Sequence, residues 1–138
     1  MRAIGYILTT GGGLTEENPE YQEQYSSISS YCNDNDHNLV KVFEDSLDRG
    51  NSRPGYLALL EFIDAPNQAS MIVVAESSQL GESLEQAIAT ILRVDRAGST
   101  VVCSSTEYPD PIQNALNFFR LERSEQIREA MLQKALDG

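Results

Sequence analysis

Short apolar runs alternate along this chain with longer segments of helical periodicity. Residues 71–75 read Met-Ile-Val-Val-Ala without a polar interruption, and residues 2–9 and 100–103 are also largely apolar. Uninterrupted runs of this length are typical of strands in a parallel sheet, because helices cover both faces of such a sheet. The alternation therefore predicts right-handed βαβ units and a doubly wound α/β fold.

Residues that favour helix starts separate these strands. Asn18 is a good N-cap with proline directly after it, which predicts a helix over residues 19–33. Pro54 opens a second predicted helix and Ser83 caps a third, whereas residues 38–44 form another predicted strand. The result is a three-layer fold with about four or five mainly parallel strands.

From Pro109 onward the chain is predicted to be one helix of about 25 residues. We therefore divide the chain into a body, residues 1–108, and a C-terminal helix, residues 109–138, and expect no separate DNA-binding domain. Apolar residues occur on more than one side of this helix, and a small body seldom buries all of them. We expect a homodimer or higher oligomer whose contact residues include Phe118, Phe119, Leu121, Ile127 and Met131.

Acidic residues dominate the charge of the chain. There are 21 Asp and Glu residues against 10 Lys and Arg residues, which gives a formal net charge of -11. DNA binding draws much of its affinity from Lys and Arg side chains that neutralise phosphates. The charge therefore predicts that direct DNA binding is weak or absent.

The composition also excludes several other classes of protein. The hydrophobic share of 41% is ordinary for a globular protein, and no apolar run approaches the ~20 residues of a transmembrane helix. The N-terminus has no signal-peptide pattern, so we place the protein in the cytoplasm and expect no membrane contact. Cys32 and Cys103 lack Cys-x-x-Cys spacing, so we expect free thiols, no metal site and no cofactor.

Polar residues follow three of the predicted strands. Thr10 comes after the first strand, Asp45 after the second, and residues 78–82 after the third. Because the carboxyl ends of parallel strands meet at one edge of a sheet, these positions are expected to converge on one site. The glycines at 11–13 suggest a different use of that edge, since successive backbone N–H groups can bind a phosphate or nucleotide. A loop of this kind is more commonly only a turn.

Three segments carry a resemblance to a known family. They are Gly5-Tyr6-Ile7-Leu8-Thr9-Thr10, the stretch from Asp45 to Arg53-Pro54-Gly55, and Ser78-Gln79-Leu80-Gly81-Glu82-Ser83. Their order and spacing, with Gln24 in the first predicted helix, resemble the N-terminal catalytic domain of the serine recombinases, the resolvase and invertase family. The resemblance implies a resolvase-like fold with flavodoxin-like strand order and a long C-terminal helix.

The resemblance also implies which residues stand at the catalytic positions. In the family the first strand reads Gly-Tyr-x-Arg-Val-Ser-Thr, and its serine attacks a DNA phosphate; the third strand leads into Asp-Arg-Leu-x-Arg-Ser. Thr10 stands at the serine, and the positions that match the family site are Thr10, Asp45, Arg53 and Gln24. The degenerate positions are Leu8, Gln79 and Glu82, which stand at arginines, and Ser78, which stands at the aspartate.

Attack on a phosphodiester builds up negative charge that positioned cations must stabilise. Of the matched positions only Arg53 supplies a cation, Glu82 adds a carboxylate, and the sequence shows no neighbouring base for Thr10. We therefore expect a catalytically inactive or impaired recombinase-like domain, not a working enzyme, that acts as an interaction or regulatory module. The alternatives are an active DNA strand-exchange domain that uses Thr10, and phosphate or nucleotide binding at residues 11–13.

Overall fold

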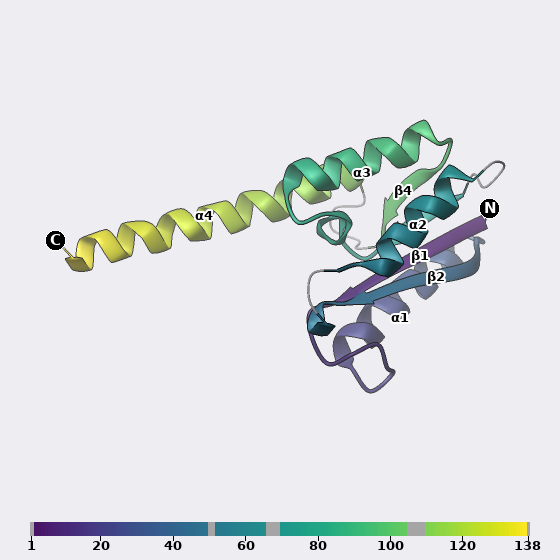
Figure 1. Cartoon of the computed structure of the whole chain (residues 1–138), viewed down its shortest axis with the longest axis horizontal. Helices are drawn as coiled ribbons and strands as arrows, with labels where there is room; N and C mark the ends of the chain where they lie inside the picture. The colour runs from purple at the N-terminus through teal and green to yellow at the C-terminus, as the bar shows by residue number, and fades with distance from the viewer. Residues whose placement is uncertain (1, 50–51, 66–69, 105–109, 138) are drawn as a thin grey trace.

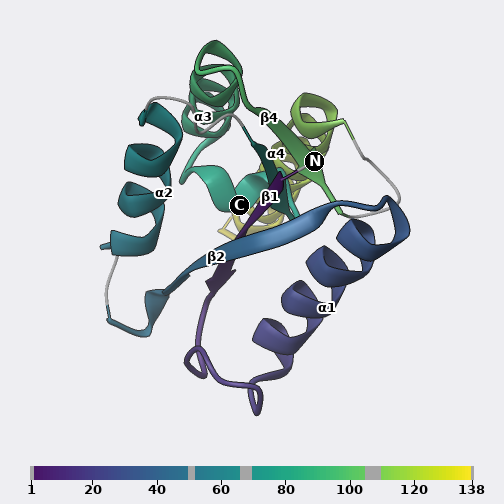
Figure 2. The same cartoon turned by 90° about the vertical axis from the view of Figure 1, so that its right-hand side faces the viewer.

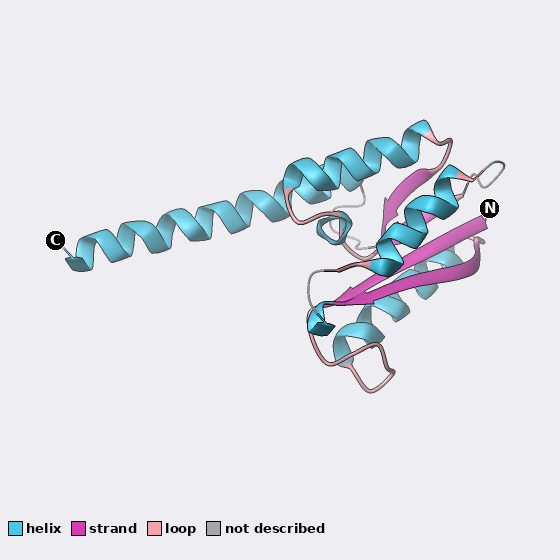
Figure 3. Ribbon diagram, viewed as in Figure 1, coloured by secondary structure: helices cyan, strands magenta, loops and turns pink. Residues whose placement is uncertain are grey.

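The computed structural model describes residues 2–49, 52–65, 70–104 and 110–137, apart from the side chains at 49, 117, 121–124 and 137. Strands and helices alternate along the chain as the sequence predicts (Figure 3). The elements are β1 (Arg2–Thr9), α1 (Pro19–Asp34), β2 (Asn38–Ser46), α2 (Pro54–Asp64), β3 (Met71–Val74), α3 (Leu84–Arg96), β4 (Thr100–Cys103) and α4 (Pro111–Asp137). Short 3₁₀ helices, η1 (Leu47–Arg49) and η2 (Ser77–Leu80), follow β2 and β3 and were not predicted.

The strands form one parallel sheet around β1. Within the described ranges the sheet is 4-stranded, in the order β2-β1-β3-β4. Tyr6 on β1 is level with Phe43 on β2 and with Val74 on β3. This is the flavodoxin-like order, and the prediction of a doubly wound α/β fold is confirmed.

Helices cover both faces of the sheet (Figure 2). On one face Ile28 and Cys32 of α1 pack against Ile7 of β1. On the other face Leu59 of α2 and Ile91 of α3 belong to the cluster that contains the β1 side chains of even number. Every residue of β1 from Ala3 to Thr9 is consequently buried, which explains why this strand is apolar throughout instead of alternating.

Capping side chains set the starts of two helices that border the site. The side chain of Asn18 accepts a hydrogen bond from the backbone N–H of Glu20, with Pro19 in the first turn of α1. The Ser83 side chain accepts from the backbone N–H of Gln86 at the start of α3. Both caps were predicted, and each satisfies an N–H group that the helix itself leaves without a partner.

The long helix α4 joins the body at its N-terminal end and projects away from it over the remainder (Figure 1). The backbone N–H of Ser77 donates to Oδ1 of Asn114 at 2.8 Å, and the Ser77 hydroxyl donates to the carbonyl oxygen of Pro111 at 2.7 Å. These bonds attach α4 to η2. Residues 125–136 are all exposed. The predicted boundary between residues 108 and 109 lies outside the described residues.

Two simpler expectations concern the thiols and the membrane. Cys32 and Cys103 are free and buried, as predicted. Among the helices that the structure describes, none has the length and apolar character needed to cross a membrane.

Candidate active site

The carboxyl ends of β1, β2 and β3 bring the predicted site residues to one edge of the sheet. β1 ends at Thr9, directly before Thr10, and Asp45 is the penultimate residue of β2. Ser78 and Gln79 lie in η2, shortly after β3. Hydrogen bonds between the segments that follow these strands bring some of the predicted residues into contact.

The hydroxyl of Thr10 is held by a carboxylate. Its Oγ1 donates to Oε2 of Glu20 at 3.0 Å, and the Thr10 backbone N–H donates to Oε1 of the same side chain at 2.9 Å. Thr10 itself is exposed. The expectation that Thr10 has no neighbouring base is therefore wrong: the chain returns through the 11–18 loop and places the first turn of α1 beside the end of β1.

The glycine loop between β1 and α1 is held by two side chains. Nδ2 of Asn18 donates to the carbonyl oxygens of Gly11 and Gly13, at 2.8 and 2.7 Å. The backbone N–H of Gly13 donates to Oδ2 of Asp48 at 2.8 Å. Gly12 and Gly13 have φ values of 82° and 77°, in the left-handed region that glycine adopts without strain. The N–H groups of Thr10 and Gly13, which could form an anion site, thus already donate to carboxylates.

The side chain of Leu8 packs into the core of the body. Its side chain is 8% exposed and belongs to the cluster formed by β1, α2, α3 and η2. Only the Leu8 backbone takes part at the site, where its N–H donates to Oε1 of Gln24 at 3.1 Å and its carbonyl accepts from Nε2 at 2.7 Å. Gln24 is therefore a positioning residue that ties α1 to β1.

A chain of neutral amides joins the remaining predicted positions. Nε2 of Gln79 donates to Oε1 of Gln24 at 2.6 Å, across from η2 to α1. Nη1 of Arg53 donates to the backbone carbonyl of Gln79 at 3.1 Å. The Nε atom of Arg53 is buried and has no hydrogen-bond partner among the described residues. The structure thus brings Gln24, Arg53 and Gln79 together through hydrogen bonds within the protein, which leave the Nε atom of Arg53 unpaired among the described residues.

Asp45 is buried and binds the protein itself. Its Oδ2 accepts the Tyr6 hydroxyl at 2.7 Å and the Tyr56 backbone N–H at 2.8 Å, and its Oδ1 accepts the Gly55 N–H at 2.8 Å. Burial, and then the bond to Asp45, raises the pKa of Tyr6 far above its ordinary value. Asp45 therefore holds the N-terminus of α2 against β1.

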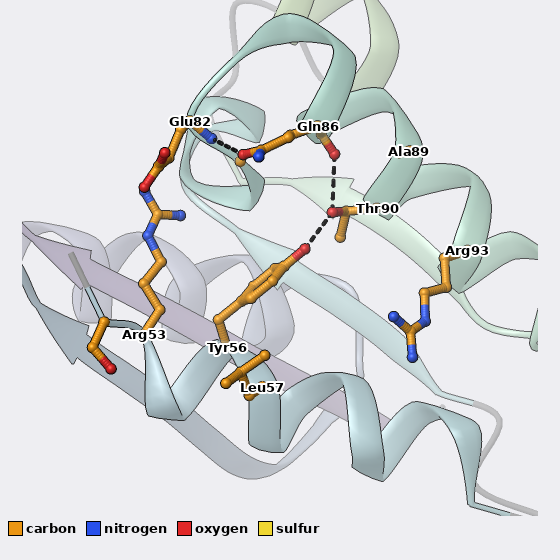
Figure 4. A pocket seen from close by; sticks show the side chains of 10 residues that line it. Arg53, Tyr56, Leu57, Glu82, Gln86, Ala89, Thr90 and Arg93 are labelled. Carbon is orange, nitrogen blue, oxygen red and sulfur yellow. Dashed lines mark hydrogen bonds between the residues drawn. The ribbon is translucent and has the colours of Figure 1, made fainter.

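A hollow of about 540 Å³ opens between α2 and α3 beside the site (Figure 4). Arg53 and Glu82 line its end nearest the site, and Arg93 lines it further along α3. Tyr56 and Thr90 meet at its floor through their hydroxyls, 2.5 Å apart. Glu82 is exposed, and its backbone N–H donates to Oε1 of Gln86 at 2.8 Å. The hollow thus combines opposite charges and is not a purely cationic site.

An active domain that uses Thr10 would need other arginines to supply the missing charge, and the sequence offers Arg49, Arg93 and Arg96. Neither Arg93 nor Arg96 bonds to Thr10 in the described part of the chain. Arg93 forms an ion pair with Asp64 on α2 at 2.5 Å, and Arg96 lies exposed at the end of α3. The Arg49 side chain is outside the described residues. Within the same ranges, no group of three His, Cys, Asp or Glu residues could hold a metal ion.

The predicted contact residues of α4 differ in exposure. Ile127 and Met131 are 53% and 67% exposed, and Phe118 is 44% exposed with its ring against that of Phe119. Phe119 is half-buried. The side chain of Leu121 lies outside the described residues.

Sequence reasoning missed Glu20 and the structural role of Asp45. A carboxylate in the first turn of a helix is common, so Glu20 looked like an ordinary helix-terminal acid. Its only distinguishing signal was the glycine-rich loop between it and Thr10, which is short enough to bring the two together. The partners of Asp45, Tyr6 and the start of α2, come from different parts of the chain.

Comparison with known proteins places this arrangement in a family. The family described as "Resolvase, N terminal domain" matches residues 12–137. No curated protein sequence is significantly similar to the chain.

Three solved structures that share this fold are distant in sequence. A resolvase family site-specific recombinase from Streptococcus pneumoniae has 18% identity over 98% of each chain, with a TM-score of 0.66. The N-terminal catalytic domain of TP901-1 integrase has 13% identity over 96% of this chain and 98% of that chain, with a TM-score of 0.62. The C-terminal catalytic domain of ISC1926 TnpA, an IS607-like serine recombinase, has 15% identity over 78% of this chain and 73% of that chain, with a TM-score of 0.64.

Proposed function

The chain belongs to the resolvase family of serine recombinases, and from that premise we propose that it is a catalytically inactive or severely impaired member that acts as an interaction or regulatory module. The observation that carries the proposal is the amide chain from Leu8 through Gln24 and Gln79 to Arg53. Arg53 is the one cation of this amide chain, whereas the neutral side chains of Leu8 and Gln79 supply none of the charge that stabilises a phosphoryl-transfer transition state.

Two further features support the loss of catalysis. Leu8 is buried among apolar side chains, so this position contributes packing where a recombinase needs a guanidinium. Arg53 is held by the Gln79 carbonyl. Loss of one oxyanion-stabilising donor typically lowers a rate by about 10² to 10³. Several such losses, even if they are not additive, leave little strand cleavage.

The interaction role rests on α4 and on charge. The exposed residues 125–136 include the apolar side chains of Ile127, Met131, Leu132 and Leu136. Ile127 and Met131 lie on one side of the helix and Leu132 and Leu136 on another, and large exposed apolar side chains repeated along a projecting helix are typical of a contact with another protein. The net charge of -11 disfavours DNA as the partner of the isolated domain. We propose a second copy of this chain, bound through α4.

A DNA strand-exchange domain that uses Thr10 is the second candidate. The observation that favours it is the 3.0 Å bond from Thr10 Oγ1 to Glu20, since a carboxylate at this distance can act as a general base. In that reaction an Oγ1–P bond would form as one ester P–O bond breaks. Glu20 would take the hydroxyl proton, and the leaving deoxyribose oxygen would gain one. Phosphate or nucleotide binding at residues 11–13 is less well supported, because the loop N–H of Gly13 already donates to Asp48.

Covalent adduct formation separates the first two candidates. The protein is incubated with a pool of nicked DNA duplexes of randomised sequence, and adducts are resolved on a denaturing gel. The proposal expects no adduct, while an active recombinase on its own suicide substrate serves as the positive control. An adduct formed by the wild type and lost in Thr10→Ala would overturn it.

A further inference from the structure

The bidentate contact between Glu20 and Thr10 suggests that Glu20 regulates the candidate active site. We infer that the Glu20 carboxylate is an internal occupant of an oxyanion site at Thr10, so that a phosphate binds there only when Glu20 is displaced. This inference rests on the proposed function, in which Thr10 is not activated for attack. It assigns Glu20 a role that blocks the site.

The geometry of the contact matches what a phosphate would use. Thr10 offers a backbone N–H and a hydroxyl, and the two oxygens of Glu20 accept one each, at 2.9 and 3.0 Å. A phosphate group also presents two acceptor oxygens to a pair of adjacent donors, and hydrogen bonds to such charged acceptors are among the stronger ones in proteins. Glu20 and a phosphate therefore compete for the same donors and repel each other.

The position of Glu20 is built into the fold. Its backbone N–H donates to Oδ1 of Asn18 at 3.1 Å, while Nδ2 of Asn18 holds the carbonyls of Gly11 and Gly13. One side chain thus fixes both the loop that follows Thr10 and the helix turn that carries Glu20. The N-terminal end of α1 also favours a carboxylate in its first turn. Both partners of the contact, Thr10 and Glu20, are therefore positioned by Asn18, although Thr10 is exposed.

Asp48 strengthens the exclusion of anions. Its Oδ2 accepts from the N–H of Gly13 at 2.8 Å, so a second carboxylate already accepts from a backbone N–H group of the loop. Like charges at short range disfavour an approaching phosphate, and low salt increases the effect. Removing Glu20 alone frees the Thr10 donors and lowers this repulsion, whereas the Asp48 contact remains.

The test compares three variants with the wild type: Glu20→Gln, Glu20→Ala and the control Glu17→Gln. Glu17 is exposed in the loop directly before α1, and Glu17→Gln changes the net charge by the same amount as Glu20→Gln. Inorganic phosphate is titrated at constant ionic strength, and the amide resonance of Thr10 is followed by NMR. We expect both Glu20 variants to bind phosphate about tenfold more tightly than the wild type, and Glu17→Gln to stay within about twofold.

Equal phosphate affinity in the Glu20 variants and Glu17→Gln, with a shifted Thr10 resonance showing that the contact is broken, would overturn the inference. The same proteins are also tested for DNA adducts. A Thr10-dependent wild-type adduct that Glu20→Gln abolishes makes Glu20 a general base, and overturns both the inference and the proposed function. If the wild-type adduct persists in Glu20→Gln and that variant binds phosphate more tightly, only the proposed loss of catalysis fails.

Discussion

The hydroxyl of Tyr6 donates to Oδ2 of Asp45 at 2.7 Å, and this buried bond joins β1 to the end of β2. The same carboxylate accepts the first backbone N–H groups of α2, from Gly55 and Tyr56. The family resemblance places Asp45 at the catalytic site, and the structure shows that the same residue also joins three elements of the fold.

Asp45→Ala is expected to lower the free energy of unfolding by about 2 to 4 kcal/mol, because it leaves the buried Tyr6 hydroxyl and two half-buried backbone N–H groups without an acceptor. Tyr6→Phe removes one donor and leaves the α2 bonds intact, so it is expected to cost about 1 kcal/mol. Urea denaturation followed by circular dichroism measures both. Equal costs for the two variants would show that Asp45 does not hold α2.

Gly55→Ala is expected to destabilise the protein by about 1 to 3 kcal/mol. A Cβ at this position would clash with the backbone carbonyl of Glu44 and reach 3.0 Å from Oδ1 of Asp45, so α2 would have to move. Gly11→Ala is the matched control, since its Cβ would meet only the Asp48 side chain, at 3.3 Å. The midpoint temperature of thermal unfolding should be clearly lower for Gly55→Ala than for Gly11→Ala. Equal midpoints would contradict the predicted clash at Gly55.

Leu8→Arg, which restores the family residue, is expected to cost about 3 kcal/mol or more, because it places a guanidinium in an apolar cluster. Leu8→Met keeps the volume and should cost less than about 1.5 kcal/mol. Glu82→Arg restores the family residue at an exposed position and should change stability by no more than about 0.5 kcal/mol. Chemical denaturation measures the unfolding free energies of these three variants. An unfolding free energy of Leu8→Arg close to that of the wild type would mean that the arginine side chain can leave the core and reach the site.

Alkaline pH is expected to destabilise the fold through Tyr21, which is half-buried, and Tyr6, which is buried. Burial and the neighbouring Glu44 carboxylate raise the pKa of Tyr21 to about 12, from an ordinary value of 10.0. The folded state therefore retains this proton where the unfolded chain loses it. The free energy of unfolding then falls as the pH rises from about 10 to about 12.

Unfolding free energies measured across this pH interval test the effect, with absorbance at 295 nm reporting tyrosinate formation. Tyr21→Phe should reduce the fall of the unfolding free energy with pH. Tyr6→Phe should reduce it as well, since the pKa of Tyr6 is also raised. Tyr25→Phe, at an exposed position of the same helix, is the control. An unchanged slope in both Tyr21→Phe and Tyr6→Phe would contradict the assignment.

The double variant Ile127→Ser, Met131→Ser is expected to convert an oligomer into a monomer without loss of stability in the body. Both side chains are more than half exposed on the projecting part of α4. Light scattering coupled to size-exclusion chromatography measures the mass over a range of concentrations, with Arg128→Ser as the control on the same turn. A wild type that remains monomeric at high concentration would exclude the α4 contact.

Local patterns in the sequence were sufficient for the elements of the fold. The apolar run at 71–75 predicted a strand that the structure places at Met71–Val74, and the caps Asn18 and Ser83 predicted the starts of α1 and α3. Both signals depend on near neighbours in the chain, namely side-chain periodicity and one capping bond. The short η1 and η2 lacked such a signal, because a single 3₁₀ turn has no hydrophobic period to detect.

The sequence by itself determined the α/β fold and the convergence of three strand ends on one edge, and its family resemblance predicted that Leu8, Gln79 and Glu82 stand at the positions of arginines. Only the tertiary structure decided what those residues do. The Glu20 contact to Thr10, the burial of Leu8 and the bonds of Asp45 to Tyr6 and α2 join segments that are distant along the chain. Hydrogen bonds of this kind depend on distances and angles set by packing of the whole sheet, which residue spacing does not encode.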